Sequence, residues 1–162
     1  MKHNTIVRWS AIFAVALLAL TASATMAAGT VGNTWDHAIS LTSVIGQPQS
    51  LAAGASQWYS VRYTGGMQDE IDLGTNGIGG VSFAVYSPDA IAAWGATGTL
   101  TPTGIGAYNP DEANYDLTWS GHPVTVDGTL YFVQVTNTNA FATKFMLNVS
   151  ASPLNAGAPM MQ

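Results

Sequence analysis

The sequence predicts an all-β protein: a single antiparallel β-sandwich, jelly-roll-like in its number of strands, that follows a cleaved N-terminal signal peptide. Beyond residue 28, apolar and polar residues alternate with a period of two in one segment after another, and no helical stripe exceeds a turn or two. Gly, Pro, Asn and Asp gather between these segments, as turns between short strands require. About eight short strands at such spacing are typical of a sandwich or jelly roll.

The first element is an export signal over residues 1–27. Lys2 and Arg8 give it a basic start, residues 11–20 are uninterrupted apolar, and residues 21–28 are small, as a signal peptidase requires. We expect cleavage after Ala27, with a cut after Ala24 as the alternative. An uncleaved anchor is the other interpretation, but an apolar run of about ten residues is shorter than the roughly 18 that a bilayer span needs. The sequence therefore predicts a secreted or cell-surface protein of a bacterium or archaeon, with no membrane span after cleavage.

The remaining chain is long enough for one domain, which we expect at residues 28–150, followed by a flexible tail at residues 151–162. It has no Cys, so its stability must come from packing and sheet hydrogen bonds. Removal of the signal leaves Arg62 and Lys144 against nine acidic residues, a net charge of −7. Such a surface excludes nucleic acid as a ligand and opposes docking on anionic lipid, because both need clustered Lys and Arg.

The strands can be read in order from the alternation. In residues 57–63, Tyr59, Val61 and Tyr63 fall on one face and Trp58 on the other, as in a strand with one buried face. The same pattern predicts strands at residues 81–85, 115–119, 124–126, 131–135 and 145–149, and shorter ones at residues 38–41, 70–73 and 91–94.

The segments between these strands carry good turn chemistry. Asp127-Gly128 separates two of the strands by two residues and predicts a tight hairpin with positive φ. Asn76-Gly77 breaks the chain before residue 81, and residues 87–89, Ser-Pro-Asp, end the strand that follows. Residues 95–114 lack periodicity and are predicted to form the longest loop, and a loop of that length is more often functional than idle.

The order of these segments resembles that of a known family. The matching pieces are Asn33-Thr34-x-x-x-Ala38-Ile39, Leu51-Ala52-Ala53-Gly54 before Gln57-Trp58-Tyr59-Ser60-Val61, Phe83-x-Val85-Tyr86-Ser87-Pro88-Asp89, Asp127-Gly128-Thr129-Leu130-Tyr131-Phe132-Val133-x-Val135, and Phe145-x-Leu147-x-Val149. In this order, over residues 33–149, the chain resembles the bacterial pre-peptidase C-terminal domain, a small β-sandwich appended to many secreted peptidases. The resemblance implies a non-catalytic sandwich with a binding or accessory role. The chain departs from the family at Gln57, where the family commonly has an Asp, so no ion or polar contact held by that Asp is implied.

Two groups of acidic and amide side chains are candidate calcium ligands. Asp69, Glu70 and Asp72 lie together on a predicted strand, with Glu70 and Asp72 on one face. The second group, at the end of the long loop, consists of Asn109, Asp111, Glu112, Asn114 and Asp116. Calcium takes six to eight oxygen ligands, although the second group does not follow the EF-hand spacing. The other interpretation of the first group is a solvated strand edge where charge discourages pairing. Calcium is the one cofactor that the sequence suggests.

Aromatic residues are the candidate ligand-binding side chains. Trp94 and Tyr108 flank the predicted loop, and Trp58 is expected to project away from the core. Trp119, which is in phase with Leu117, is instead expected to pack in the core.

Catalytic residues are scarce. His37 and His122 are the only histidines after the signal, and there is neither a Cys nor a Gly-x-Ser-x-Gly motif. A glycosidase-like pair of Asp72 and Asp116 is all that the sequence leaves open. The sequence therefore predicts a secreted non-catalytic module that binds an extracellular polysaccharide or a partner protein, with calcium as a candidate structural ion. The alternative is a self-associating subunit of a cell-surface layer, filament or matrix, because the scarcity of Lys leaves sheet edges poorly guarded.

Overall fold

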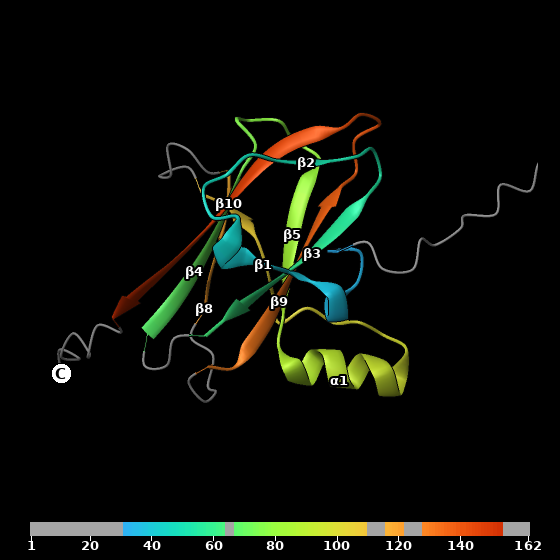
Figure 1. Cartoon of the computed structure of the whole chain (residues 1–162), viewed down its shortest axis with the longest axis vertical. Helices are drawn as coiled ribbons and strands as arrows, with labels where there is room; N and C mark the ends of the chain where they lie inside the picture. The colour runs from blue at the N-terminus through green and yellow to red at the C-terminus, as the bar shows by residue number, and fades with distance from the viewer. Residues whose placement is uncertain (1–30, 64–66, 110–115, 122–127, 154–162) are drawn as a thin grey trace, which may run out of the picture.

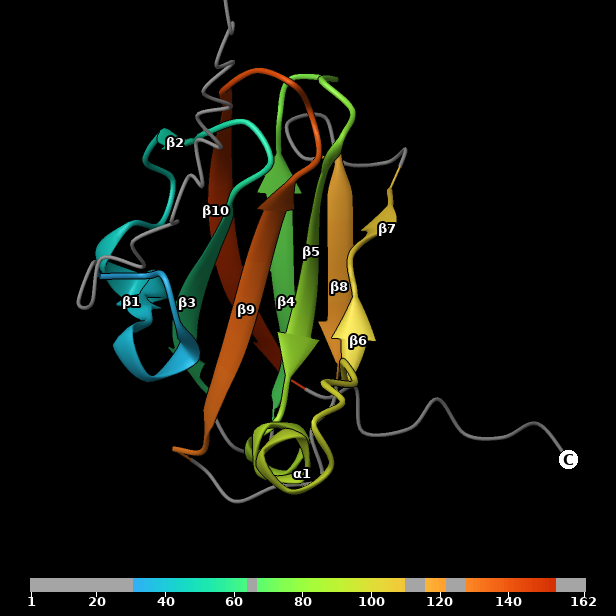
Figure 2. The ribbon, with the colours of Figure 1, turned by 90° about the vertical axis from the view of Figure 1, so that its right-hand side faces the viewer.

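Two five-stranded β-sheets lie face to face, as the sequence predicts, with one sheet in front of the other in Figure 2. The computed structural model describes residues 31–63, 67–109, 116–121 and 128–153 (Figure 1). The predicted signal peptide therefore lies outside the described residues. In the described part of the chain, all strand pairs are antiparallel except β1 and β3, which are parallel.

The first sheet consists, in spatial order, of β1 (Ile39–Ser40), β3 (Ser56–Arg62), β9 (Leu130–Asn137), β5 (Val81–Tyr86) and β6 (Gly104–Ile105). The second consists of β2 (Gln49–Leu51), β10 (Thr143–Pro153), β4 (Met67–Gly74), β8 (Leu117–Gly121) and β7 (Ala107–Tyr108). The helical elements are η1 (Trp35–His37), η2 (Leu41–Ser43) and α1 (Pro88–Thr97).

Most of the predicted strands are confirmed. The predictions for residues 57–63, 70–73, 81–85, 131–135 and 145–149 correspond to β3, β4, β5, β9 and β10, and β8 covers the end of the strand predicted at residues 115–119. Residues 38–41 form only the short β1 and the start of η2. The strand predicted at residues 124–126 lies outside the described residues, and β10 continues to Pro153, beyond the predicted domain end at residue 150.

The main core fills the space between the two sheets. Tyr59 and Val61 of β3 point into it, as the alternation predicts, and Tyr59 packs edge-on against Phe145 of β10 at a ring distance of 6.3 Å. Trp119 packs at the margin of this core, which confirms its predicted role. Burial raises the pKa of the Tyr59 hydroxyl, which donates a hydrogen bond to Oε1 of Gln57 (3.1 Å).

The strand predicted at residues 91–94 is wrong, because these residues belong to α1. The expectation that no helix exceeds two turns is also wrong, because α1 has ten residues. Ser87 caps the helix, its hydroxyl accepting from the Ala90 N–H (3.2 Å), and Pro88 takes the first helical position. Gly98 ends the helix with a left-handed φ of 72°. The Ser-Pro-Asp sequence is thus a helix start as well as a strand end, and the predicted loop of residues 95–114 is shortened by α1, β6 and β7.

Residues 104–108 carry the chain from the first sheet to the second along one side of the sandwich. β6 pairs with β5, and β7 pairs with β8. A Cβ on Gly104 would overlap the indole of Trp119, and one on Gly106 would overlap the ring of Phe83. The two glycines therefore let the backbone lie directly against the aromatic side chains that close this side of the core.

Asn137, which is fully buried at the end of β9, ties two loops together. Its amide nitrogen lies 3.1, 3.0 and 2.9 Å from the carbonyl oxygens of Leu51, Ala52 and Phe141. Its side-chain oxygen accepts from the Asn139 N–H (3.0 Å). Asn139 in turn donates to the Gly79 carbonyl (2.9 Å), so this end of the sandwich is held by side-chain amides.

No helix in the described ranges has both the length and the apolar character needed to cross a membrane.

Candidate functional site

An apolar cleft lies at the end of the sandwich where the β4–β5 turn approaches β7 and the start of β8. It has a volume of about 220 Å³. Its lining consists of Thr75, Gly77, Ile78, Gly79, Val81, Tyr108, Asp116 and Leu117. Residues from the predicted Asn-Gly turn, from the predicted long loop and from β8 are therefore brought together here.

Asp116 holds the turn that forms one wall of the cleft. Its carboxylate accepts hydrogen bonds from the backbone N–H of Thr75 (2.6 Å) and of Gly77 (3.2 Å), and it contacts the Thr75 hydroxyl. Asn76 and Gly77 both have positive φ, 55° and 78°, which fits the predicted turn. The carboxylate thus holds the tight turn through hydrogen bonds to two backbone N–H groups.

Tyr108 and Ile78 supply the exposed apolar surface of the cleft. The Tyr108 side chain is 74% exposed and that of Ile78 is 42% exposed, although both are large hydrophobic residues. Val81 and Leu117 lie below them as less exposed lining. Tyr108 was a predicted binding residue, whereas Ile78 and Leu117 were not. The available signal for Ile78 was a large apolar residue placed inside a Gly-rich turn.

The other two predicted binding aromatics do not join Tyr108. Trp58 does project from the outer face of the first sheet, as its strand phase predicts, but it is buried there, not available to a ligand. It packs on Tyr86 at a ring distance of 5.3 Å, in a second apolar cluster with Ile91 of α1 and Phe132. Trp94 is half-buried on α1, which lies at the end of the sandwich opposite the β4–β5 turn (Figure 2).

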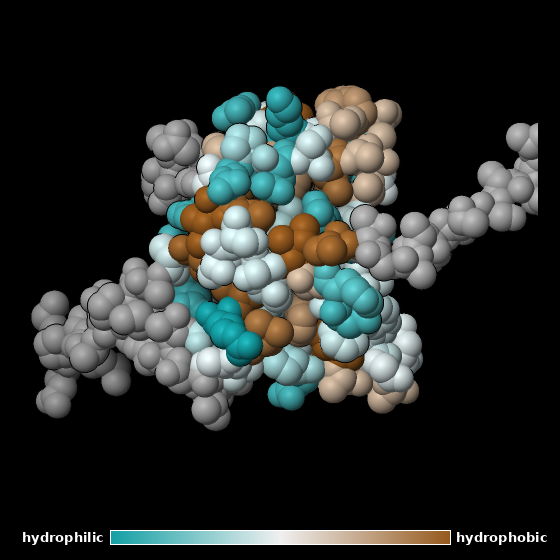
Figure 3. All heavy atoms as spheres, viewed as in Figure 1, coloured by the Kyte–Doolittle hydropathy of each residue, from teal (hydrophilic) through white to brown (hydrophobic). Residues whose placement is uncertain are grey.

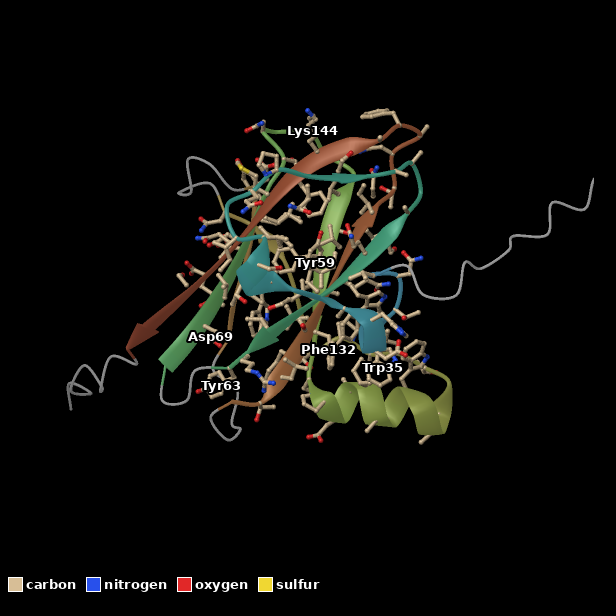
Figure 4. All side chains as sticks on the ribbon, in the orientation of Figure 1. Trp35, Tyr59, Tyr63, Asp69, Phe132 and Lys144 are labelled. Atoms are coloured by element: carbon tan, nitrogen blue, oxygen red, sulfur yellow. The ribbon has the colours of Figure 1, made fainter. Side chains whose placement is uncertain are left out.

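A second groove, of about 290 Å³, runs beside η1 on the outer face of the first sheet. It is lined by Trp35, Asp36, Ala38, Ser60, Leu130 and Phe132. Trp35 packs edge-on against Phe132 at 5.7 Å, and both are labelled in Figure 4. The pKa of Asp36 is lowered, mainly by a hydrogen bond with the Thr34 side chain and also by His37, whose Nδ1 lies 3.2 Å from Oδ2 of Asp36.

The face that carries η1, β1 and η2 shows apolar groups of modest size among polar ones (Figure 3). Trp35, at 36% exposure, is much less open than Tyr108. We therefore take the cleft at Tyr108, not the groove at Trp35, as the candidate functional site.

The acidic residues of β4 point to different sides of the second sheet. Asp69 lines the interior beside Ile71 and Trp119, near the end of the sandwich opposite Lys144 (Figure 4). Asp72 accepts a hydrogen bond from the Thr118 hydroxyl (2.9 Å) on the other face, the face that it shares with Glu70. The three carboxylates thus do not converge on one point.

The predicted loop ligands Asp111, Glu112 and Asn114 lie outside the described residues, whereas Asn109 and Asp116 lie within them. In the described ranges there is no group of three or more His, Cys, Asp or Glu side chains that could hold a metal ion. Calcium binding by the loop stays a prediction, which a comparison of melting temperatures with calcium and with a chelator would test.

Comparison with known proteins finds no matching family model and no matching curated protein. Among solved structures, the chain is similar to PliG of Aeromonas hydrophila, a periplasmic inhibitor of g-type lysozyme. The TM-score is 0.44 at 18% identity, over 65% of this chain and 82% of that one.

The chain is also similar to the pre-peptidase C-terminal domain of a collagenase from Bacillus anthracis. Here the TM-score is 0.43 at 10% identity, over 65% of this chain and 90% of that domain. This structure belongs to the family that residues 33–149 resemble in sequence order.

Proposed function

We propose that the chain is an exported, non-catalytic binding module whose ligand is a protein that inserts an apolar side chain into the cleft at Tyr108. The observation that carries the proposal is the 74% exposure of Tyr108 on the rim of an apolar cleft, one wall of which is a turn hydrogen-bonded to Asp116. Large exposed aromatic residues beside a pre-formed hollow are typical of the anchor points of protein interfaces.

The lining of the cleft favours a protein over a polysaccharide. Sugar rings stack on aromatic side chains, but they also need several polar groups for their hydroxyls. The carboxylate of Asp116 already accepts hydrogen bonds from Thr75 and Gly77, and Ile78, Val81 and Leu117 offer only apolar atoms from their side chains. The net charge of −7 after signal cleavage favours a partner with a basic surface, because opposite charges speed and orient the encounter.

The Tyr108→Ala variant tests the site. Binding of the exported chain is measured by calorimetry against g-type lysozyme and by co-sedimentation with insoluble chitin and cellulose. We expect saturable binding to a protein probe that Tyr108→Ala weakens at least about tenfold, as for an anchor residue, with an unchanged melting temperature. The matched control is Phe141→Ala, because Phe141 is also an exposed aromatic residue, at 56%, but does not line the cleft.

The outcomes discriminate among the parts of the proposal. Binding that Tyr108→Ala leaves unchanged would remove the cleft from the proposal. Tyr108-dependent binding to chitin or cellulose alone would replace the protein partner with a polysaccharide. Release of hydrolysis products from any probe would show that the chain is an enzyme.

A second candidate function, a subunit of a surface layer or filament, is favoured by one observation. The distal half of β10, beyond Leu147, has no neighbouring strand on its outer side in the described part of the chain. Assembly into a filament requires two compatible edges, and the outermost strands elsewhere in the described ranges are short: β1, β6 and β7 have two residues each and β2 has three. We therefore rank this function second.

A further inference from the structure

Strand β10 extends beyond its outer neighbour. It spans Thr143–Pro153, but β2 pairs only with Thr143, Lys144 and Phe145. One further hydrogen bond, from the Gly46 N–H to the Leu147 carbonyl (2.9 Å), continues the pairing on that side. On the inner side, β4 pairs with β10 all the way from Met146 to Pro153, and Figure 1 shows the two strands running together away from β2.

The backbone groups on this edge have a defined direction. Because the Leu147 carbonyl points away from β4, the N–H and C=O groups of Val149 and Ala151 also point away from it. Pro153 has the same phase, and a proline in a strand is tolerated where its missing N–H would face outward. Besides the Leu147 N–H and the Pro153 C=O at its two ends, the edge therefore presents the N–H and C=O groups of Val149 and Ala151 to an additional strand.

Between Leu147 and Pro153, where the strand ends, this edge lacks the usual guards. From Phe145 to Pro153 the strand has no charged residue, and Ser150, at the centre of the edge, is exposed. Natural sheets keep such edges apart with Lys, with bulges or with very short strands. The register of β10 with β4 runs without a bulge over eight consecutive pairs.

We propose that this edge binds the same edge of a second copy, with the two β10 strands antiparallel about Ser150. In this register Val149 pairs with Ala151 of the partner subunit, and Ala151 pairs with Val149 of the partner subunit. Each pair exchanges two hydrogen bonds, so this register satisfies the outward N–H and C=O groups of Val149 and Ala151 in both strands. Ser150 faces Ser150 of the partner subunit, which places no charge at the axis.

A second copy fits this edge better than an unrelated strand because the pattern is its own complement under a two-fold rotation. The pairing is isologous and closes at two copies, so it gives a dimer and not a filament. After signal cleavage each copy has a net charge of −7, which opposes association at long range, and salt screens this repulsion. Dimerisation is therefore expected to be weak at low ionic strength and to strengthen with added salt.

This inference does not depend on the proposed function. β10 and β7, which carries Tyr108, lie on opposite sides of β4 and β8 in the second sheet. A substitution on the β10 edge leaves the cleft at Tyr108 unchanged, and a substitution in the cleft leaves the edge unchanged. Either proposal can therefore fail alone.

The first test is sedimentation equilibrium of the exported chain from about 10 μM to about 1 mM, at low and at high salt. We expect a monomer–dimer equilibrium that Ala151→Pro weakens at least about tenfold, since the substitution removes one N–H from each strand and half of the exchanged bonds. The melting temperature should not change, because this N–H points away from β4. Ala158→Pro, C-terminal to the described residues, is the matched control and should dimerise like the native chain.

The second test uses charge at the axis. Ser150→Glu should dimerise less than the native chain, because two glutamates would face each other and each would lie beside Glu70 of its own copy. A mixture of Ser150→Glu with Ser150→Lys should form mixed dimers in preference to either pure dimer, as native mass spectrometry would show.

Three results would overturn the proposal. One is a native chain that stays monomeric at the highest concentration in high salt. Another is an Ala151→Pro variant that dimerises like the native chain, which would place the interface elsewhere. The third is a marked loss of thermal stability in Ala151→Pro at monomer concentrations, which would mean that another part of this chain occupies the edge.

Discussion

Asn137 is the residue on which the cleft end of the sandwich most depends. It is fully buried, and its amide group serves carbonyl oxygens from two different loops. We predict that Asn137→Ala lowers the free energy of unfolding by about 2–4 kcal/mol, because buried carbonyl groups lose their donor. Asn137→Asp should be worse, since it places a carboxylate against those oxygens. Urea denaturation measures the loss of stability in both variants. The control is Thr138→Ala, because Thr138 lies in the same turn but is exposed, and it should cost much less. Equal losses in Asn137→Ala and Thr138→Ala would refute the structural role of Asn137.

Tyr59 makes the stability sensitive to high pH. Burial raises the pKa of its hydroxyl above the ordinary value of 10.0, so the folded chain keeps the proton while the unfolded chain loses it. The contribution of the protonated Tyr59 hydroxyl to the free energy of unfolding is complete below about pH 10. It is lost as the pH rises above this value, by up to about 1.4 kcal/mol for each pH unit. Denaturation at pH 9 and at pH 11 should therefore show a smaller loss in Tyr59→Phe than in the native chain. The same loss in both would contradict the prediction.

At the scale of elements, the crossing at residues 104–108 is the tightest part of the fold. We predict that Gly106→Ala destabilises the protein by about 1–3 kcal/mol, because its methyl group would overlap the Phe83 ring and force a shift of the backbone. Gly79→Ala is the control, since a Cβ there meets nothing within 4 Å. Thermal melting compares the two, and a Gly106→Ala variant as stable as Gly79→Ala would show that the crossing can relax.

The elements also show why sequence reasoning worked for the strands and failed for α1. In β3, Tyr59 and Val61 face the core while Ser60 does not. Because only one face of the strand is buried, apolar residues are required at every second position, and this alternation is visible in the sequence. Helix α1 buries only Ile91 fully, and its Ala-rich sequence carries almost no apolar stripe. The evidence for this helix was in its ends, Ser87-Pro88 and Gly98, which also fit a turn.

At the scale of the whole molecule, the sandwich could be predicted but the cleft only in part. Tyr108 was identified because it flanks a segment without periodicity. Its neighbours could not be found, because Ile78 and Asp116 are far apart in the sequence and meet only through the pairing of β4 with β8. The strand phase places Trp58 on the correct face, but no pattern in the sequence indicates that Ile91 of α1 packs with Trp58 there and helps to bury it.

The position of α1 outside the sandwich has a consequence for how the protein opens. Its support, a cluster of Trp58, Tyr86, Ile91 and Phe132, shares no side chain with the core between the sheets. The backbones of β3, β9 and β5 separate the two clusters. Structures built this way unfold in cooperative units of different stability. We therefore expect the helix to detach in a sub-global opening that hydrogen exchange would register. The core around Tyr59 and the distant cleft at Tyr108 should keep their folded structure during this opening.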